Sequence, residues 1–272
     1  MPSQAKPDPT LENIKDLGRR IDWSKTAGDY AQYRAGFPDA FFERLAGMGI
    51  IRAGHAALDL GCGTGTIARG LAIRGMQVTG LDRLQAMMER AARLDREAGV
   101  MVRYVTATAE STGLGDQSFD LVTAGQCWPW FDSRRTASEV RRVLKPGGRL
   151  VIANFDWIPL PGNVADETEK LIMTHNPAWK LNGGMGIHPL YVRVLGLSGY
   201  RNIETFSFDL DAPYTHESWR GRIRASAGIG ADLELGAVER FDAEMAAMLD
   251  EKFPGDSLPV HHRVFAAIGV AP

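Results

Sequence analysis

The chain is poor in cysteine and lacks long apolar runs. Cys62 and Cys127 are its two cysteines among 272 residues, which excludes a disulfide scaffold and a zinc site made of thiolates alone. Two thiols suit a reducing compartment. No apolar run reaches the roughly 18 residues that a membrane-spanning helix needs, and residues 1–10 carry no apolar core of the signal-peptide type. We therefore expect no membrane span and a cytoplasmic location.

An excess of charge of one sign is also missing. The chain has 31 Lys and Arg against 33 Asp and Glu, a formal net charge of −2, and the two signs are interspersed. This pattern argues against nucleic acid as a partner, and no cluster of carboxylates indicates a metal site. At 272 residues with 44% hydrophobic content, the chain is expected to form a single domain over residues 1–272.

What the sequence does contain is a glycine-rich turn between an apolar segment and a helical one. The order is Ala56-Ala57-Leu58-Asp59-Leu60-Gly61-Cys62-Gly63-Thr64-Gly65-Thr66, followed by apolar residues at helical spacing over 67–72. We expect a buried strand, a turn through three alternate glycines, and a helix. Glycines leave such a turn free of side chains, and the first backbone N–H groups of the helix point at whatever lies on it.

Two other glycine-rich motifs fit this turn less well. A dinucleotide fingerprint has the order G-x-G-x-x-G, whereas Gly65 falls one residue early. A phosphate-binding loop ends on G-K-[ST], and no lysine follows Gly65. Asp59, two residues before the first glycine, would repel a pyrophosphate and suits a cationic, amine-bearing ligand.

The next predicted strand, residues 77–82, also ends on an acidic residue, Asp82. A carboxylate at this place accepts hydrogen bonds from ribose hydroxyls in dinucleotide-binding folds. The alternative is that Asp59 and Asp82 are ordinary solvated residues at strand ends. The glycines and both acids occur together, which favours a nucleoside site.

This block resembles the class I, Rossmann-like methyltransferases that use S-adenosylmethionine, of the small-molecule type 11 kind found in ubiquinone and menaquinone biosynthesis. Their first motif, L-D-[LIV]-G-C-G-T-G, matches Leu58–Gly65 without a break, and the resemblance covers about residues 28–155. It implies that Asp59 and the turn face the methionine part of the cofactor and that Asp82 holds the ribose. The cofactor-binding residues that we expect are Tyr30, Arg34, Asp59, Gly61, Cys62, Gly63, Thr64, Gly65, Asp82, Arg83, Ala109, Glu110 and Gln126.

Further motifs carry the same resemblance. Tyr30, Tyr33 and Arg34 match a Y-x-x-Y-R stretch that closes over the cofactor in related enzymes; packing of the first helix onto the sheet is the alternative. Ala109-Glu110 matches part of a loop that lines the adenine. Residues 142–148 match R-x-L-K-P-G-G, which leads a helix back into the fifth strand.

Strand and helix patterns alternate along the chain, which predicts an α/β fold with a doubly wound, mostly parallel sheet. Together with the resemblance, this gives a seven-stranded sheet whose last strand is antiparallel. Residues 1–45 are expected to form N-terminal cap helices, and the insertions 156–187 and 211–258 a helical lid, because loops on a rigid scaffold usually carry specificity. The later strands are expected at 100–106, 118–124, 149–155, 202–208 and 259–270.

Tryptophans follow the fourth and fifth strands, where cofactor and substrate should meet. We expect Trp128, Trp130 and Trp157 to contact the substrate; simple packing is the alternative. Related enzymes often carry a histidine just before a W-F pair, and Trp128-Pro129 replaces that segment here. Three arginines of the second insertion offer a carboxylate site, but their spacing of two lets no more than two share a helical face. They are Arg220, Arg222 and Arg224.

Methyl transfer from a sulfonium is an in-line displacement, to which a protein contributes orientation, desolvation and in some cases a base. No motif fixes a catalytic residue. Asp156, at the tip of the fifth strand, and His188 are the two weak candidates that we retain, and the other histidines considered are His175, His216, His261 and His262.

The sequence thus predicts an S-adenosylmethionine-dependent methyltransferase that methylates an oxygen, nitrogen or carbon atom of a small molecule. A protein that binds S-adenosylmethionine or S-adenosylhomocysteine without catalysis is one alternative. An enzyme of the same fold that uses a nicotinamide cofactor is another. A homodimer is left open as an assembly.

Overall fold

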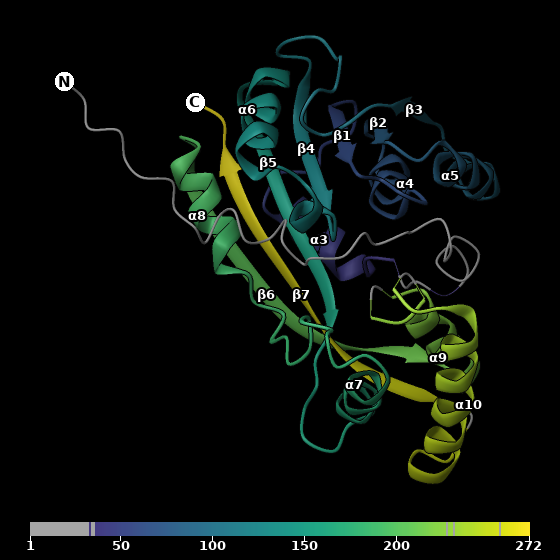
Figure 1. Cartoon of the computed structure of the whole chain (residues 1–272). Coiled ribbons are helices and arrows are strands. Elements are labelled where there is room, and N and C mark those ends of the chain that lie inside the picture. The colour runs from purple at the N-terminus through teal and green to yellow at the C-terminus, as the bar shows by residue number, and fades with distance from the viewer. Residues whose placement is uncertain (1–32, 34–35, 227, 231, 256) are drawn as a thin grey trace.

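The fold is built around one seven-stranded sheet. The structure is a computed structural model, and it describes residues 33 and 36–272, apart from 227, 231 and 256. The strand order is β3-β2-β1-β4-β5-β7-β6 (Figure 1). Neighbouring strands are parallel except that β7 runs antiparallel to both β5 and β6. The strands are β1 (Ala56–Leu60), β2 (Gln77–Asp82), β3 (Val102–Thr106), β4 (Phe119–Gly125), β5 (Leu144–Trp157), β6 (Arg201–Tyr214) and β7 (Leu258–Val270). The predicted sheet is confirmed.

Helices cover both faces of this sheet, as the doubly wound pattern predicted. A short 3₁₀ turn at Trp128–Trp130 follows β4. The helices are α3 (Asp39–Gly47), α4 (Thr66–Ile73), α5 (Gln85–Glu97), α6 (Ser133–Val143), α7 (Val164–His175), α8 (Pro189–Leu197), α9 (His216–Arg224) and α10 (Leu235–Lys252).

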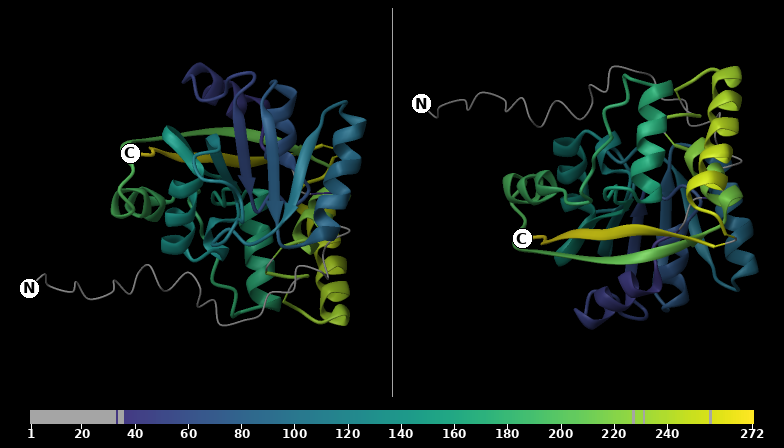
Figure 2. Two further views of the ribbon diagram at one scale, coloured as in Figure 1. Left: turned by 90° about the horizontal axis from the view of Figure 1, so that it is seen from above. Right: turned by 90° about the horizontal axis from the view of Figure 1, so that it is seen from below.

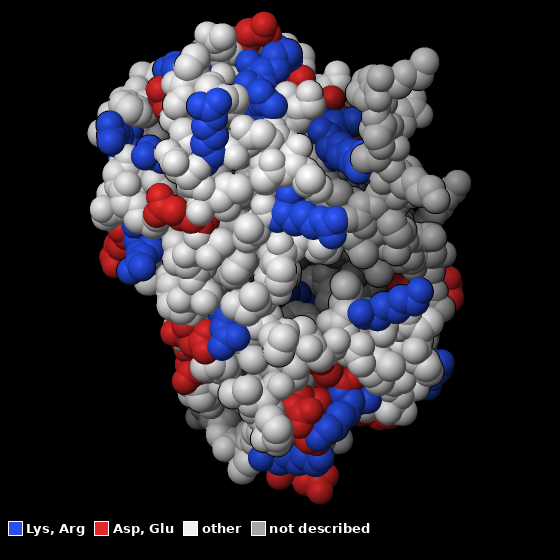
Figure 3. Space-filling model, turned by 90° about the vertical axis from the view of Figure 1, so that its left-hand side faces the viewer, with Lys and Arg blue, Asp and Glu red and all other residues white. Residues whose placement is uncertain are grey.

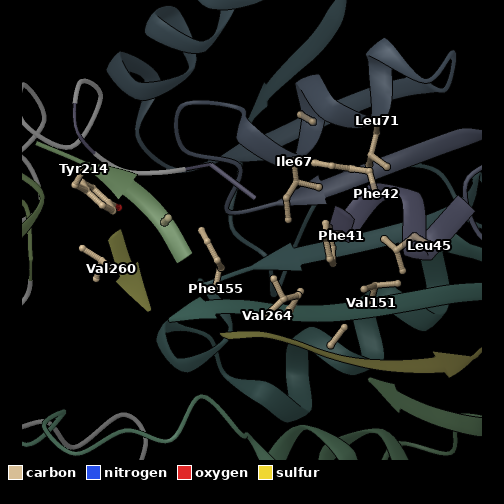
Figure 4. Close-up of a cluster of buried hydrophobic side chains, with 14 of the residues drawn as sticks. Phe41, Phe42, Leu45, Ile67, Leu71, Val151, Phe155, Tyr214, Val260 and Val264 are labelled. Atoms are coloured by element: carbon tan, nitrogen blue, oxygen red, sulfur yellow. The ribbon is translucent and has the colours of Figure 1, made fainter. Parts of the chain in front are cut away.

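Alternate residues of β5 divide the hydrophobic core into two clusters, because successive side chains of a strand point to opposite faces. Val151 and Phe155 pack in the cluster that includes Phe41 and Phe42 of α3 (Figure 4). Leu150 and Ile152 pack on the other face, with residues of α6 and α8. Both faces of the central strands are therefore buried, which accounts for their nearly continuous apolar sequence.

The three C-terminal strands are longer than their sequence pattern predicts. Residues 156–157 were assigned to a lid loop, but β5 continues through them, with Asp156 opposite Arg263 of β7. Likewise, β6 was expected to end at residue 208 and runs on to Tyr214, opposite Leu258. Figure 2 shows β6 and β7 as a long two-stranded ladder. Pairing with β7 supplies the backbone hydrogen bonds that extend both strands.

Helices α7, α9 and α10 lie together where this ladder ends (Figure 1). Trp219 of α9 and Phe241 of α10 are fully buried in their packing. Asp242 of α10 accepts hydrogen bonds from Arg220 and Arg224 of α9. The segment between β6 and β7 is therefore 215–257 rather than 211–258, because 211–214 and 258 are strand; its role as a lid stays a prediction.

The expected N-terminal cap over residues 1–45 falls mostly outside the described residues. Its described part is residue 33 and the start of α3, which continues to Gly47. Within the ranges that the structure describes, none of the helices has both the length and the apolar character to cross a bilayer.

Candidate functional site

Three glycines turn the chain sharply between β1 and α4. Gly61, Gly63 and Gly65 all have positive φ, at 58°, 52° and 76°, a conformation that costs other residues energy. A Cβ added to Gly61 would lie 2.8 Å from Cβ of Cys127, so no larger residue fits there. The strand, turn and helix that the sequence predicts are confirmed.

Asp59 lies behind this turn rather than on an open surface. Its side chain accepts hydrogen bonds from the backbone N–H of Ala68 (3.1 Å) and from Thr123 Oγ1 (2.7 Å). The residue is 2% exposed, and burial raises the pKa of its carboxyl group to about 7. Asp59 therefore ties α4 to β4 beneath the turn and does not line the cavity; its contact with a ligand stays a prediction.

Asp82, at the end of β2, lies beside the same turn. Its Oδ2 accepts the N–H of Gly63 and its Oδ1 accepts the N–H of Leu84, both at 2.9 Å. These two hydrogen bonds hold the carboxylate against the glycines. Each carboxylate oxygen keeps a further lone pair for a ligand.

A cavity of about 750 Å³ opens at the carboxyl ends of the parallel strands. This is the edge at which open α/β sheets bind ligands. Of the residues expected to bind the cofactor, seven line this cavity: Gly61, Gly63, Asp82, Arg83, Ala109, Glu110 and Gln126. Figure 3 shows a hollow on one face of the molecule, with both signs of charge distributed around it.

The other expected cofactor residues that the structure describes do not line the cavity. Cys62 and Thr64 are buried within the turn, and a Cβ on Gly65 would meet Tyr104 Oη at 2.7 Å. Tyr30 and Arg34 lie outside the described residues.

Two cavity residues are fixed by backbone contacts. Glu110 Oε1 accepts the N–H of Asp132 at 2.9 Å, which joins the loop after β3 to the start of α6. Gln126 has a φ of 57°, rare for a residue with a side chain. Its amide Nε2 donates to the carbonyl oxygen of Phe155, and its backbone N–H donates to Ala153. Gln126 thereby links the ends of β4 and β5 at the cavity wall.

The three predicted substrate tryptophans have different places. Trp128 is fully buried in the cluster beneath α6 and α8 and does not line the cavity; packing, the alternative that we left open, is its role. Trp130 lines the cavity and is 39% exposed at its rim. Trp157 also lines it, donates from Nε1 to Glu169 Oε1 (2.8 Å), and lies 4.8 Å from the Arg222 guanidinium.

Asp156 and His188, the two weak catalytic candidates, meet on the cavity wall. Oδ2 of Asp156 and Nε2 of His188 are 2.8 Å apart. The imidazole is stacked on Tyr191, with ring centroids 4.9 Å apart and planes 8° from parallel. Tyr191 Oη in turn donates to Asn154. The histidine is thus fixed both by a carboxylate and by an aromatic face.

The remaining histidines are placed elsewhere. His175, His216 and His261 each pair with a carboxylate outside the cavity lining. His262 is buried against Phe155, and burial lowers its pKa to about 4, so it is neutral at pH 7. Among the described residues, no three His, Cys, Asp or Glu side chains gather as metal ligands.

Comparison with known proteins agrees with this geometry. Residues 58–152 match the family model described as "Methyltransferase domain". Two solved structures share the fold. One is a protein from Anaeromyxobacter dehalogenans described as a type II methyltransferase, with 23% identity and a TM-score of 0.59, and the match covers 88% of this chain and 97% of that one. The other is a phosphoethanolamine N-methyltransferase from Haemonchus contortus bound to S-adenosylhomocysteine, with 21% identity and a TM-score of 0.57, and the match covers 98% of this chain and 62% of that one. Residues 58–152 thus match a methyltransferase domain in sequence, and the described chain shares the fold of these two structures.

Curated relatives of this methyltransferase domain include a 27-O-demethylrifamycin SV methyltransferase from Amycolatopsis mediterranei, 32% identical over 187 residues, 65% of this chain and 64% of the relative. An uncharacterized methyltransferase from Mycobacterium tuberculosis is 35% identical over 130 residues, 48% of this chain and 50% of the relative. The chain thus spans about half the length of the first curated relatives that it matches.

Sequence reasoning missed several residues of the cavity. Glu169, Ser226 and Gly228 line it from α7 and from the turn after α9, and no motif marks them. Arg222 was named, as one of three arginines for a carboxylate. The structure separates it from the other two: Arg220 and Arg224 pair with Asp242, whereas Arg222 is buried and lines the cavity. The spacing rule that no more than two share a face is confirmed.

Proposed function

We propose that this protein is an S-adenosylmethionine-dependent methyltransferase that acts on a small molecule. The observation that supports it most is one cavity with two different walls. On one side lie the glycine turn and Asp82; on the other lie the Asp156–His188 pair and Trp157. Such a cavity holds a nucleoside and a second molecule side by side, which a group transfer requires.

The residues on the first wall fit S-adenosylmethionine. Gly61 and Gly63 carry no side chains that would occupy the shelf, and a Cβ on Gly61 would collide with Cys127. Asp82 and Glu110 place carboxylates on the lining, which suits ribose hydroxyls and an amine-bearing purine. When bound, the cofactor would supply an activated methyl group on a sulfonium. Asp82 would hold the ribose, and the 107–110 loop would flank the adenine.

The residues on the second wall suit proton removal from the methyl acceptor. With Asp156 accepting the Nε2–H of His188, the neutral imidazole has its lone pair on Nδ1. Nδ1 would take the proton of a hydroxyl or amine as that atom becomes the nucleophile, and Asp156 would stabilise the imidazolium that forms. Stacking on Tyr191 restricts the ring to one orientation.

Thermal unfolding with two ligands separates cofactor classes among the candidate functions. S-adenosylhomocysteine at 100 times its Kd should stabilise the full chain by about 2.7 kcal/mol, and NADH should not shift the transition. Stabilisation by NADH alone would overturn the proposal in favour of a nicotinamide enzyme. Transfer of a labelled methyl group to at least one member of a panel of phenols, hydroxyacids and amines then excludes a protein that only binds the cofactor.

The base is tested by His188→Asn and Asp156→Asn. We expect each to lower kcat by about 10²-fold or more and to leave S-adenosylhomocysteine affinity within about twofold. The matched control is His261→Asn, which removes a histidine that also pairs with carboxylates but lies outside the cavity. A kcat of His188→Asn within about twofold of the unaltered chain would assign the pair a structural role.

A further inference from the structure

Four side chains at one wall of the cavity form a closed ring of contacts. Asn154 Nδ2 donates to Oδ1 of Asp156 at 3.3 Å, and Tyr191 Oη donates to Oδ1 of Asn154 at 3.0 Å. The Asp156–His188 hydrogen bond and the stacking of His188 on Tyr191 close the ring. Tyr191 is 2% exposed and does not line the cavity, whereas the other three residues do. Asn154 and Tyr191 therefore support the pair that would remove the acceptor's proton.

Two short stretches of sequence build this ring. Asn154 and Asp156 are two residues apart on β5, so their side chains point to the same face of the sheet. His188 directly precedes α8, and Tyr191 follows three residues later in its first turn, which places the two rings side by side. Phe265 of β7 pairs with Asn154 in register and packs near both rings, with centroids 5.6 Å and 6.4 Å away. The ring of contacts thus follows from the packing of α8 against this part of the sheet.

The hydrogen-bonding capacities of these groups fix the direction of each bond. An ionised carboxylate only accepts, so one oxygen of Asp156 receives the amide N–H of Asn154 and the other receives the ring N–H of His188. The amide oxygen of Asn154 then faces Tyr191, whose hydroxyl donates to it. The carboxylate cannot rotate without losing one of its two hydrogen bonds.

We propose that Asn154 and Tyr191 are positioning residues for methyl transfer. They hold the Asp156 carboxylate so that the His188 ring keeps its proton on Nε2 and leaves Nδ1 bare for the acceptor's proton. This inference rests on the function proposed above, in which His188 is the base. Tyr191 acts in two ways, since its ring supports the imidazole and its hydroxyl orients Asn154.

Substitutions in two backgrounds test whether these residues act through His188. Asn154→Leu keeps the approximate size of the side chain, and Tyr191→Phe keeps the stacking ring. We expect each to lower kcat about 3- to 10-fold, as the loss of one or two hydrogen bonds gives, and to leave S-adenosylhomocysteine affinity within about twofold. In a His188→Asn background neither should lower kcat further. A further drop of the same size there would overturn the inference, because the residues would then act on something other than the base.

Tyr200→Phe is the matched control. Tyr200 belongs to the same hydrophobic cluster as Tyr191, is 4% exposed, and donates from its hydroxyl to the carbonyl oxygen of Ala137. It lies outside the cavity lining, so the variant should lose a similar amount of stability and keep its kcat. Equal losses of kcat in Tyr200→Phe and Tyr191→Phe would show that kcat follows stability alone, and would also overturn the inference.

A second measurement does not depend on activity. With ¹⁵N-labelled histidine in the full chain, the ring shifts of His188 report which nitrogen carries the proton, and their loss in His188→Asn assigns them. At pH 9, where a free imidazole is neutral, we expect the unaltered chain to hold the proton on Nε2 alone and Asn154→Leu to populate both tautomers. Both tautomers in the unaltered chain, or one in the variant, would overturn the inference. Absence of methyl transfer by the unaltered chain would instead overturn the proposed function.

Discussion

Asp59 was predicted to contact the ligand, and the structure shows contacts of its carboxylate that the sequence did not indicate. Its place before the glycines suggested a ligand contact, yet both of its oxygens are used by Ala68 and Thr123. Burial raises its pKa from 3.8 to about 7. The folded state therefore holds a proton between about pH 4 and pH 7 that the unfolded chain has released, so this group's contribution to stability falls as pH rises through that window.

Asp59→Asn should remove this dependence. We expect the free energy of unfolding of the variant, relative to the unaltered chain, to increase between pH 4.5 and pH 7.5 by up to about 4 kcal/mol, since each pKa unit corresponds to about 1.36 kcal/mol. Urea unfolding of both proteins at the two pH values measures it. A constant difference would show that the carboxyl group ionises normally in the fold.

Asp82 is the residue on which cofactor affinity should depend most. Asp82→Asn keeps its size but removes the charge and one pair of acceptor positions, so we expect S-adenosylhomocysteine to bind about 10- to 100-fold more weakly, equivalent to roughly 1–3 kcal/mol. Calorimetric titration measures the change. Glu97→Gln, an exposed carboxylate at the end of α5, is the control and should bind normally. Equal affinities would reject the ribose assignment.

At the scale of single elements, the packing of α3 on α4 depends on Gly70. A Cβ at this position would lie 2.2 Å from the Phe42 ring, so Gly70→Ala must displace that ring. We expect a loss of about 1–3 kcal/mol in stability, because overpacking outweighs the gain of about 1 kcal/mol in helix propensity.

Gly47→Ala is the matched control, since a Cβ on Gly47 meets nothing within 4 Å. It should leave stability unchanged or raise it by up to about 1 kcal/mol. Chemical unfolding with unchanged m values compares the two. Equal effects of the two substitutions would show that the Phe42 ring moves aside freely.

Local patterns predicted the central elements closely and the long C-terminal strands poorly. The bounds of β1 and β2 follow from apolar runs that end at Leu60 and Asp82, because buried parallel strands have that composition. The ends of β5 and β6 depend instead on pairing with β7, a segment distant in sequence. The start of α9 at His216, by contrast, follows a local signal, the Thr215–Ser218 capping box.

The lining of the cavity beside the glycine turn was largely predictable from the sequence, and the lining opposite it was not. Contiguous motifs around Gly61 and Asp82 mark the first half. Residues such as Glu169 and Ser226 reach the second half from separate insertions, and their meeting depends on how these pack. Trp128 illustrates the limit: an aromatic residue beside a site and one in the core have the same local pattern, and only the fold distinguishes them.

For the whole molecule, the link between α9 and α10 governs how firmly the segment 215–257, our predicted lid, is held. Asp242 forms ion pairs with both Arg220 and Arg224 in a partly buried cluster. Burial alone would raise the pKa of Asp242, but the hydrogen bonds from the two guanidinium groups lower it below its usual value. Its stabilising contribution is therefore present at neutral pH and is lost as pH falls through its folded pKa.

Asp242→Asn should loosen the lid without unfolding the sheet. We expect amide hydrogens of α9 and α10 to exchange roughly tenfold faster, as loss of about 1.4 kcal/mol would give, while those of β1 and β4 keep their rates. Glu251→Gln, an exposed acid on α10, is the control. Uniform acceleration across all strands would show that the lid and the sheet open as one unit.

The ladder of β6 and β7 has a consequence for how such a protein changes over time. At about 3.3 Å per residue, its strands of 14 and 13 residues extend over roughly 45 Å. One end is anchored in the sheet, and the other supports α9 and α10. Segments at the free end can therefore be exchanged between related proteins. Such an exchange leaves unaltered the anchored end, which belongs to the sheet that carries the proposed nucleoside site. A chimera with another lineage's residues 215–257 should therefore inherit the donor's choice of acceptor.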